Sequence, residues 1–155
     1  VRMIKNMIRI LTHMRNRILS LLTFIFLLTG SCSGPEGFKK PEDALDAARE
    51  FVRAVLDGDY KRAELYVLPE EDDMRLFLRY KDYMKNQPEK ERLGLKSSSI
   101  LVNKVEALND TVSIINYSNS FSKKPMDIRV VKKDGEWWVD FSYTFSGDEE
   151  MKPLE

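Results

Sequence analysis

Cysteine and histidine are nearly absent from this sequence of 155 residues, which contains one of each, Cys32 and His13. A single cysteine excludes an intramolecular disulfide and a zinc site built from four cysteines. Because His13 precedes Cys32, the chain after Cys32 contains neither residue type. That part of the chain therefore lacks the side chains for Ser-His or Cys-His nucleophilic catalysis and for histidine-ligated metal sites.

Acidic residues are missing from the first 31 positions, although the whole chain is formally neutral, with 25 basic and 25 acidic residues. The basic residues there are Arg2, Lys5, Arg9, Arg15 and Arg17. The chain after residue 31 therefore keeps 20 basic residues against 25 acidic ones, a net charge near −5. Because neutralisation of phosphates by Lys and Arg supplies most nonspecific affinity for nucleic acids, this acidic part is not expected to bind them.

An apolar run follows the basic region, from Ile18 to Leu28, and leads into small residues at positions 29–31. This order of basic, apolar and small residues is the layout of a secretory signal. The run has eleven residues, whereas a helix needs about 20 to cross a bilayer core, so a permanent membrane span is not expected. Residues 1–31 are therefore predicted to be an export signal, and Met14 is an alternative start that would make it compact.

The segment Leu28-Thr29-Gly30-Ser31-Cys32 resembles the lipobox of bacterial lipoproteins, in which a small residue precedes the cysteine. The resemblance implies that Cys32 receives diacylglycerol, that the signal is cleaved before it, and that fatty acyl chains such as palmitate anchor the protein. One myristoyl chain binds a membrane only marginally, whereas two or more chains hold a protein there durably. Cleavage by an ordinary signal peptidase near Ser31 and an uncleaved anchor remain the alternatives.

The stretch at residues 33–40 contains Gly, Pro and Ser without periodicity, which predicts a tether. Under the enterobacterial sorting rule for lipoproteins, Ser33 after the cysteine favours the outer membrane. The predicted location is therefore the bacterial cell envelope, with the protein lipid-anchored in the outer membrane and facing the periplasm. The expected domains are the signal at 1–31, the lipidated cysteine and tether at 32–40, a folded domain at 41–146 and a disordered tail at 147–155.

Helical spacing of apolar residues dominates the first half of the predicted domain. Pro41 suits a first helical position and Gly58 a carboxyl-terminal stop, which predicts a helix of about four turns between them. Asp59 can cap a second, short helix that runs through Tyr66. A third helix is predicted over residues 70–87, which lie between two prolines.

From about residue 97 the apolar period falls to two residues, which predicts strands. The predicted apolar faces, strand by strand, are Ile100, Val102, Val105 and Ala107, with a slip in phase after Val102; Val112, Ile114 and Tyr117; Met126, Ile128 and Val130; and Trp137, Val139, Phe141 and Tyr143. Asp134-Gly135 is a hairpin signal between the last two strands. Helices followed by an antiparallel meander predict an α+β fold, with about three helices on a sheet of about four strands.

Two segments carry a resemblance to a known family, PEDALDAAREFVRAVLDGDYKRAELYV and VVKKDGEWWVDF. With an acidic third helix between them, they resemble the small bacterial lipoproteins of unknown function in the nuclear transport factor 2-like superfamily, a cystatin-like α+β fold that is also similar to lumazine-binding-protein-like domains. The resemblance covers about residues 40–145 and implies a strongly curved sheet around the first helix, forming a cone that often contains a pocket. It implies no activity, because this fold hosts enzymes, binding modules and scaffolds.

The adjacent Trp137 and Trp138 could form a ligand platform, but neighbouring strand residues face opposite sides of a sheet. We therefore expect one tryptophan to pack in the core and the other to cover the outer face. The resemblance to isomerases and dehydratases of the superfamily draws attention to Asp127 and Asp140 as candidate pocket carboxylates. Because a general base needs burial and a substrate within reach, we expect both to lie on the solvated face instead.

The acidic run at residues 70–73 lacks the spacing of a calcium-binding loop, and the favourable position of acids at a helix start explains it. Tyr60, Tyr66, Tyr80 and Tyr83 are expected to pack and to form local hydrogen bonds. No catalytic residue, metal site or cofactor is predicted, and Cys32 is the one predicted site, for lipidation.

These observations predict a membrane-anchored envelope lipoprotein that is not an enzyme and that binds a small ligand or an envelope protein through its cone opening or its sheet. One alternative is an enzyme of the isomerase or hydrolase type that uses a pocket carboxylate. The other is an accessory structural subunit, which a closed and fully packed cone would favour over ligand binding.

Overall fold

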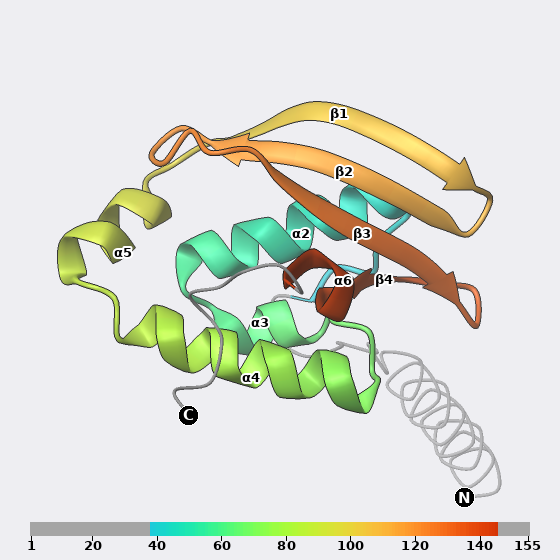
Figure 1. The fold of residues 1–155 in the computed structure, drawn as a ribbon, viewed down its shortest axis with the longest axis horizontal. Coiled ribbons are helices and arrows are strands. Elements are labelled where there is room, and N and C mark those ends of the chain that lie inside the picture. Colours follow the sequence, from blue (N-terminus) through green and yellow to red (C-terminus); the bar gives the residue numbers. More distant parts are fainter. Residues whose placement is uncertain (1–37, 146–155) are drawn as a thin grey trace, which may run out of the picture. The chain divides into compact units, whose positions relative to one another are not determined.

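The computed structural model describes residues 38–145 (Figure 1). The predicted export signal, Cys32 and the predicted tail at 147–155 lie outside the described residues. The elements in chain order are α2 (Ala44–Asp57), α3 (Tyr60–Glu64), α4 (Glu71–Lys85), α5 (Glu89–Lys96), β1 (Ile100–Asn109), β2 (Val112–Asn119), β3 (Met126–Lys133), β4 (Glu136–Asp140) and α6 (Phe141–Phe145). The chain thus forms an α+β domain with helices first and an antiparallel sheet after them, as the sequence predicts.

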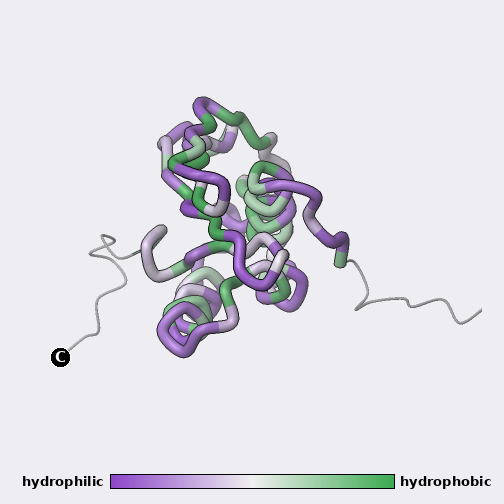
Figure 2. Tube along the Cα trace, turned by 90° about the vertical axis from the view of Figure 1, so that its right-hand side faces the viewer, coloured by the Kyte–Doolittle hydropathy of each residue, from purple (hydrophilic) through white to green (hydrophobic). Residues whose placement is uncertain are grey.

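The four strands form an antiparallel meander in the order β1-β2-β3-β4. α2 lies across one face of this sheet, between the sheet and the helices α3 and α4 (Figure 1). Hydrophobic stretches of strands and helices lie next to one another, with hydrophilic turns around them (Figure 2). The sheet is not strongly curled.

The start of α2 differs from the predicted one. The Asp43 carboxylate accepts a hydrogen bond from the Asp46 N–H at 2.7 Å, so the helix begins at Ala44. The predicted first helical position, Pro41, lies before this cap and outside the helix. The prediction was wrong there because the Asp43 side chain satisfies a free N–H group of the first turn, which Pro41 cannot do.

The end of α2 and the start of α3 are confirmed. Gly58 ends α2 in the left-handed conformation, with a φ of 75°, which glycine adopts without strain. The Asp59 carboxylate then caps α3 by accepting a hydrogen bond from the Arg62 N–H at 3.1 Å. Two adjacent residues thus turn the chain from one helix into the next.

Two predicted features of the sheet are also confirmed. The pairing of β1 with β2 shifts between Val102 and Lys104, where the sequence changes phase, although the apolar face predicted after the shift was wrong, because Val105 and Ala107 are exposed. Asp134 and Gly135 both have positive φ, 54° and 82°, in the turn between β3 and β4. This is the backbone conformation that a two-residue hairpin of this sequence requires.

The predicted inward face of β2 was wrong for two residues. β2 buries Ser113, Ile115 and Tyr117, whereas Val112 and Ile114 are only half-buried. Ile115 pairs with Ile128 of β3 across the sheet, and each is 1% exposed. Because side chains alternate along a strand, this pairing fixes which half of β2 faces the core.

The last predicted strand was too long. β4 ends at Asp140, and Phe141–Phe145 form α6 instead of continuing the strand to Tyr143. The cause is a carboxylate on α4: Asp73 accepts hydrogen bonds from the N–H groups of Phe141 at 2.6 Å and Ser142 at 3.0 Å. Asp73 is 2% exposed, and burial raises the pKa of its carboxyl group, while these two hydrogen bonds oppose the increase.

α6 completes an aromatic core. The rings of Phe141 and Phe145 stack with centroids 4.2 Å apart. Phe141 also meets Phe77 of α4 edge-on at 5.5 Å and Phe51 of α2 at 6.1 Å. A continued strand would place Phe141 and its successors alternately on two faces, whereas the helical turn places residues four apart on one face.

The sequence analysis did not predict α5. Among the residues of α5, none is buried, so it lacks the apolar stripe that marks a helix in a sequence. Its Gly94 lies against the ring of Phe121, which leaves no room for a Cβ atom without movement of that ring. α5 thus lies at the surface and approaches the turn that follows β2.

Replacing Asp73 by alanine removes the acceptor of two N–H groups at the start of α6. We expect Asp73→Ala to lower the free energy of unfolding by about 1–3 kcal/mol, because at least one buried N–H group loses its partner. Asp73→Asn keeps a carbonyl oxygen and removes a charge that burial disfavours, so we expect a smaller loss. Urea unfolding followed by circular dichroism measures both.

The exposed neighbour Asp72 provides the matched control, since its side chain is 73% exposed. Asp72→Ala should change the free energy of unfolding by less than about 1 kcal/mol. An equal loss for Asp72→Ala and Asp73→Ala would contradict the capping role of Asp73.

Candidate functional site

A cleft of about 370 Å³ opens between α5 and the carboxyl-terminal ends of α2 and α4. Its apolar lining consists of Val55, Leu56, Met84, Leu93 and Leu95. Its polar and charged lining consists of Asp57, Tyr60, Lys85, Glu89, Arg92 and Lys96. All of these residues come from helices, so the cleft lies on the helical side of the domain.

Tyr60 reaches the cleft because of the turn between α2 and α3. Gly58 and Asp59 reverse the chain, and Tyr60 is the first residue of α3. The side chain is 8% exposed, and burial raises the pKa of its phenol, while the positive charge of Arg92 offsets part of the increase. The phenol is therefore protonated at neutral pH and can donate a hydrogen bond in the cleft.

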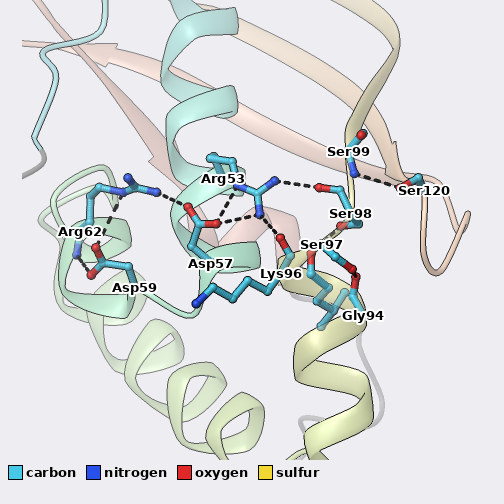
Figure 3. A network of polar contacts seen from close by, with 11 residues as sticks. Arg53, Asp57, Asp59, Arg62, Gly94, Lys96, Ser97, Ser98, Ser99 and Ser120 are labelled. Carbon is cyan, nitrogen blue, oxygen red and sulfur yellow. Dashed lines mark hydrogen bonds and ion pairs between the residues drawn. The ribbon is translucent and has the colours of Figure 1, made fainter.

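Arg53 of α2 holds the carboxyl-terminal end of α5 (Figure 3). Its guanidinium donates hydrogen bonds to the carbonyl oxygens of Ser98 at 2.8 Å and Lys96 at 3.1 Å. The last carbonyl groups of a helix lack partners within it and carry partial negative charge, so a cation stabilises them. The contact joins residues 45 positions apart and fixes one wall of the cleft.

Asp57 connects this contact to α3. One carboxylate oxygen accepts a hydrogen bond from Arg53 Nε at 3.1 Å, and the other accepts one from an Arg62 Nη atom at 2.8 Å (Figure 3). Both oxygens are thus occupied, and two guanidinium groups balance the charge. Asp57 therefore acts as a bridge between helices, and the charge of the cleft is set by Lys85, Arg92 and Lys96 against Glu89.

The space between α2 and the sheet is filled. The hollow lined by Val52, Ile115, Tyr117 and Ile128, among others, measures about 10 Å³. A single water molecule needs about 10–15 Å³. The place where the sequence resemblance implies a pocket therefore has room for about one water.

The two tryptophans divide as predicted. Both are half-buried on β4, and Trp137 packs against the core. Trp138 follows it and, by strand alternation, starts from the other face of the sheet, but both tryptophans also border one small hollow beside β4. Neither lines the helical cleft.

The two candidate carboxylates lie away from the cleft. Asp127 is exposed and accepts a hydrogen bond from the side chain of Asn116 at 2.6 Å. Asp140 accepts hydrogen bonds from the Tyr143 N–H at 2.9 Å and the Ser142 hydroxyl at 3.1 Å, at the start of α6. Asp140 also forms an ion pair with Arg129 at 3.5 Å. The expectation of solvation holds for Asp127, whereas Asp140 has a side chain only 13% exposed, because these partners surround it.

The tyrosines follow different patterns. Tyr66 is 1% exposed and bonds to the backbone of Lys39, and Tyr80 packs on Phe141 with ring centroids 5.5 Å apart. Tyr83 is 37% exposed, and Tyr60 lines the cleft. The sequence analysis predicted only local packing for Tyr60, because the sequence of α5, which forms the opposite wall of the cleft, has no apolar spacing that predicts a helix.

The acids at residues 70–73 do not share one role. Glu70 is the N-cap residue of α4 without a capping side-chain bond, and the next three lie in its first turn, where Asp73 also caps α6. Among residues 38–145, no group of three or more His, Cys, Asp or Glu is arranged to hold a metal ion. In the same range, no helix combines the length and apolar character needed to cross a membrane.

Removal of the Arg53 side chain should loosen α5. We expect Arg53→Ala to lower the free energy of unfolding by about 1–2 kcal/mol, because two carbonyl groups and Asp57 lose a charged donor that is partly exposed to solvent. Amide hydrogen exchange should accelerate at Ser97 and Ser98, whose N–H groups bond to carbonyls within α5. Arg75→Ala is the control, since its ion pair with Asp72 is exposed. Unchanged hydrogen exchange in Arg53→Ala would rule out that Arg53 holds the end of α5 in place.

Comparison of the chain with protein-family models, with curated proteins and with solved structures found no match.

Proposed function

We propose that this chain is a membrane-anchored envelope lipoprotein whose domain binds a small amphipathic anion in the cleft beneath α5, without catalysing a reaction. The observation that carries the proposal is the composition of that cleft, which combines an apolar lining with three basic side chains. An amphipathic anion is a molecule with an acid group at one end and an apolar portion at the other.

The size and apolar lining of the cleft suit a small organic molecule. Its volume of about 370 Å³ lies within the range of about 300–1,000 Å³ that is typical of ligand sites. Met84 lines the cleft and is 8% exposed, and a methionine side chain adapts to ligands of different shape. The apolar portion of the ligand would lie against Met84, Leu93 and Leu95.

The charged lining suits an acid group. Lys85, Arg92 and Lys96 outnumber Glu89, and Asp57 is already balanced by Arg53 and Arg62. The protonated phenol of Tyr60 adds a neutral donor close to Arg92. A carboxylate or a phosphate would accept charge-assisted hydrogen bonds from these groups.

The same geometry supports a role in binding rather than in catalysis. General acid–base catalysis needs a titratable group with a pKa near the working pH and with access to the substrate. The raised pKa of Tyr60 keeps the phenol protonated, and Asp57 is engaged on both oxygens. The proposal therefore assigns these side chains to recognition and to helix packing.

A relationship to the nuclear transport factor 2-like superfamily is part of the proposal. The long first helix, the Gly58-Asp59 step into α3 and the meander that ends in a hairpin support it. The weakly curled sheet and the filled space beneath it mean that the proposed ligand site differs from the usual cone interior.

Binding of a protein partner is a second candidate function. Leu101, Val105 and Leu108 of the edge strand β1 are 48%, 48% and 55% exposed, and an edge strand can pair with another chain. The phase shift after Val102 and the exposed Lys104 weaken this candidate, because bulges and lysines protect edges from such pairing.

Octanoate tests the cleft as a simple amphipathic anion. We expect it to shift the methyl resonance of Met84 in a saturable manner in protein labelled on its methionine methyl groups. In Arg92→Gln/Lys96→Gln we expect the Kd to rise about tenfold or more, which corresponds to about 1.4 kcal/mol of lost interaction. Lys104→Gln removes an exposed lysine outside the cleft and should leave the Kd unchanged. Equal binding of octanol, which has no acid group, would contradict recognition of an anion.

Intact-mass measurement of membrane-extracted protein tests the anchor. We expect a wild-type mass that begins at Cys32 and includes acyl chains, because the lipobox resemblance places the modification on that thiol. Cys32→Ala should lose the acyl mass and partition away from the membrane, whereas Ser33→Ala should retain both. An unmodified wild-type mass, or unchanged partition of Cys32→Ala, would overturn the lipoprotein proposal.

A further inference from the structure

The first described residues of the chain are fixed to the domain. The ring of Phe38 lies 5.3 Å from that of Tyr66, and the Tyr66 hydroxyl donates to the Lys39 carbonyl and accepts from the Lys39 N–H, both at 3.1 Å. Lys40 forms an ion pair with Glu136 of β4 at 2.9 Å. The chain therefore enters the domain at a defined place, beside β4.

Aromatic side chains surround this place. Phe38, Lys40, Leu65, Trp137 and Trp138 line one shallow hollow together with two neighbours, and we call these five residues the exit surface. Both tryptophans and Phe38 are half-buried, so part of each ring faces solvent. The exit surface holds both tryptophans of the chain.

The predicted tether between Cys32 and the exit surface is short. Six Cα–Cα steps separate Cys32 from Phe38, and they span at most about 20–22 Å. If the acyl chains of Cys32 lie in a bilayer, Phe38 must stay within about this distance of them.

We propose that the exit surface contacts the interfacial layer of the membrane that carries the anchor, with Trp137 and Trp138 at headgroup depth. Tryptophan is enriched at membrane interfaces because its ring is apolar and its indole N–H is a hydrogen-bond donor. This inference rests on the proposed lipid anchor at Cys32.

The contact is aromatic rather than electrostatic. Lys39, Lys40 and Lys133 near the exit surface are already paired with Asp46, Glu136 and Glu70. Lys132 lies over the ring of Trp137 at 5.3 Å from its centroid. A zwitterionic bilayer therefore suffices, and salt has little effect on the contact.

This orientation directs the ligand cleft away from the bilayer. The β3–β4 turn lies at one end of the long axis of the domain and α5 at the other (Figure 1). A domain that rests on its exit surface thus opens its cleft to the aqueous side.

The two tryptophans allow a direct test in the full, lipidated protein. The protein is reconstituted into phosphatidylcholine vesicles with or without bromine on the upper part of the acyl chains, and bromine quenches only nearby indoles. We expect loss of fluorescence in the brominated vesicles for wild type and for each of the single-tryptophan variants Trp137→Phe and Trp138→Phe. Added sodium chloride should not restore it.

The control moves the tryptophan to the far end of the domain. Leu93 of α5 is 58% exposed, so Leu93→Trp in the background Trp137→Phe/Trp138→Phe reports on α5. We expect no quenching there. Equal quenching of this variant and wild type, or no quenching of wild type, would overturn the exit-surface contact.

The mass of the reconstituted protein separates the two proposals. Acylated protein without quenching overturns the exit-surface contact alone and leaves the lipoprotein proposal standing. A protein without acyl chains overturns the anchor, and the exit-surface contact falls with it.

Discussion

A single buried carboxylate, that of Asp73, determines how the helices and the sheet meet. It accepts the N–H groups of Phe141 and Ser142, which ends β4 and starts α6. The helical turn then places Phe141 against Phe51 and Phe77, and Phe145 against Phe141 and Tyr80, so this part of the aromatic core depends on it. Burial of a charge is unfavourable by itself, and the raised pKa of Asp73 reflects this. The two hydrogen bonds offset that cost, since they stabilise the carboxylate. They also give the two N–H groups at the start of α6 an acceptor.

The sequence predicts the parts of the fold that nearby residues determine. Gly58 and Asp59 set the step between α2 and α3, and Asp134-Gly135 sets a hairpin, because each pair fixes its own backbone conformation. The end of β4 depends instead on a contact between residues 68 positions apart. No periodicity within the last strand could have revealed it, since Phe141 and Tyr143 continue the alternation that precedes them. The inward face of β2 likewise depends on its pairing with β3.

The cleft was not predictable for the same reason. Its outer wall, α5, has no buried residue, so hydrophobic spacing does not distinguish it from a loop. Its position comes from Arg53, whose guanidinium reaches the end of α5 from α2. An arginine within an amphipathic helix normally indicates a solvated face, and only the three-dimensional arrangement gives it a partner. Tyr60 was identified as a packing residue, and it is one, but the cleft beside it forms only once α5 is held in place.

Attachment of residues 38–40 to the domain also changes the energetics of membrane contact. A tether that remained free up to residue 40 would have to lose the conformational freedom of all its residues when the domain docks, and each ordered residue costs about 1–2 kcal/mol. Phe38, Lys39 and Lys40 are already held by Tyr66, Asp46 and Glu136, so these three residues would lose little further conformational freedom on docking. In the proposed lipid-anchored protein, the small number of residues between Cys32 and Phe38 would also keep the domain close to the bilayer, which would raise the effective concentration of the exit surface there. Weak aromatic contacts would then be sufficient to orient the domain if the proposed acyl anchor retains it at the membrane.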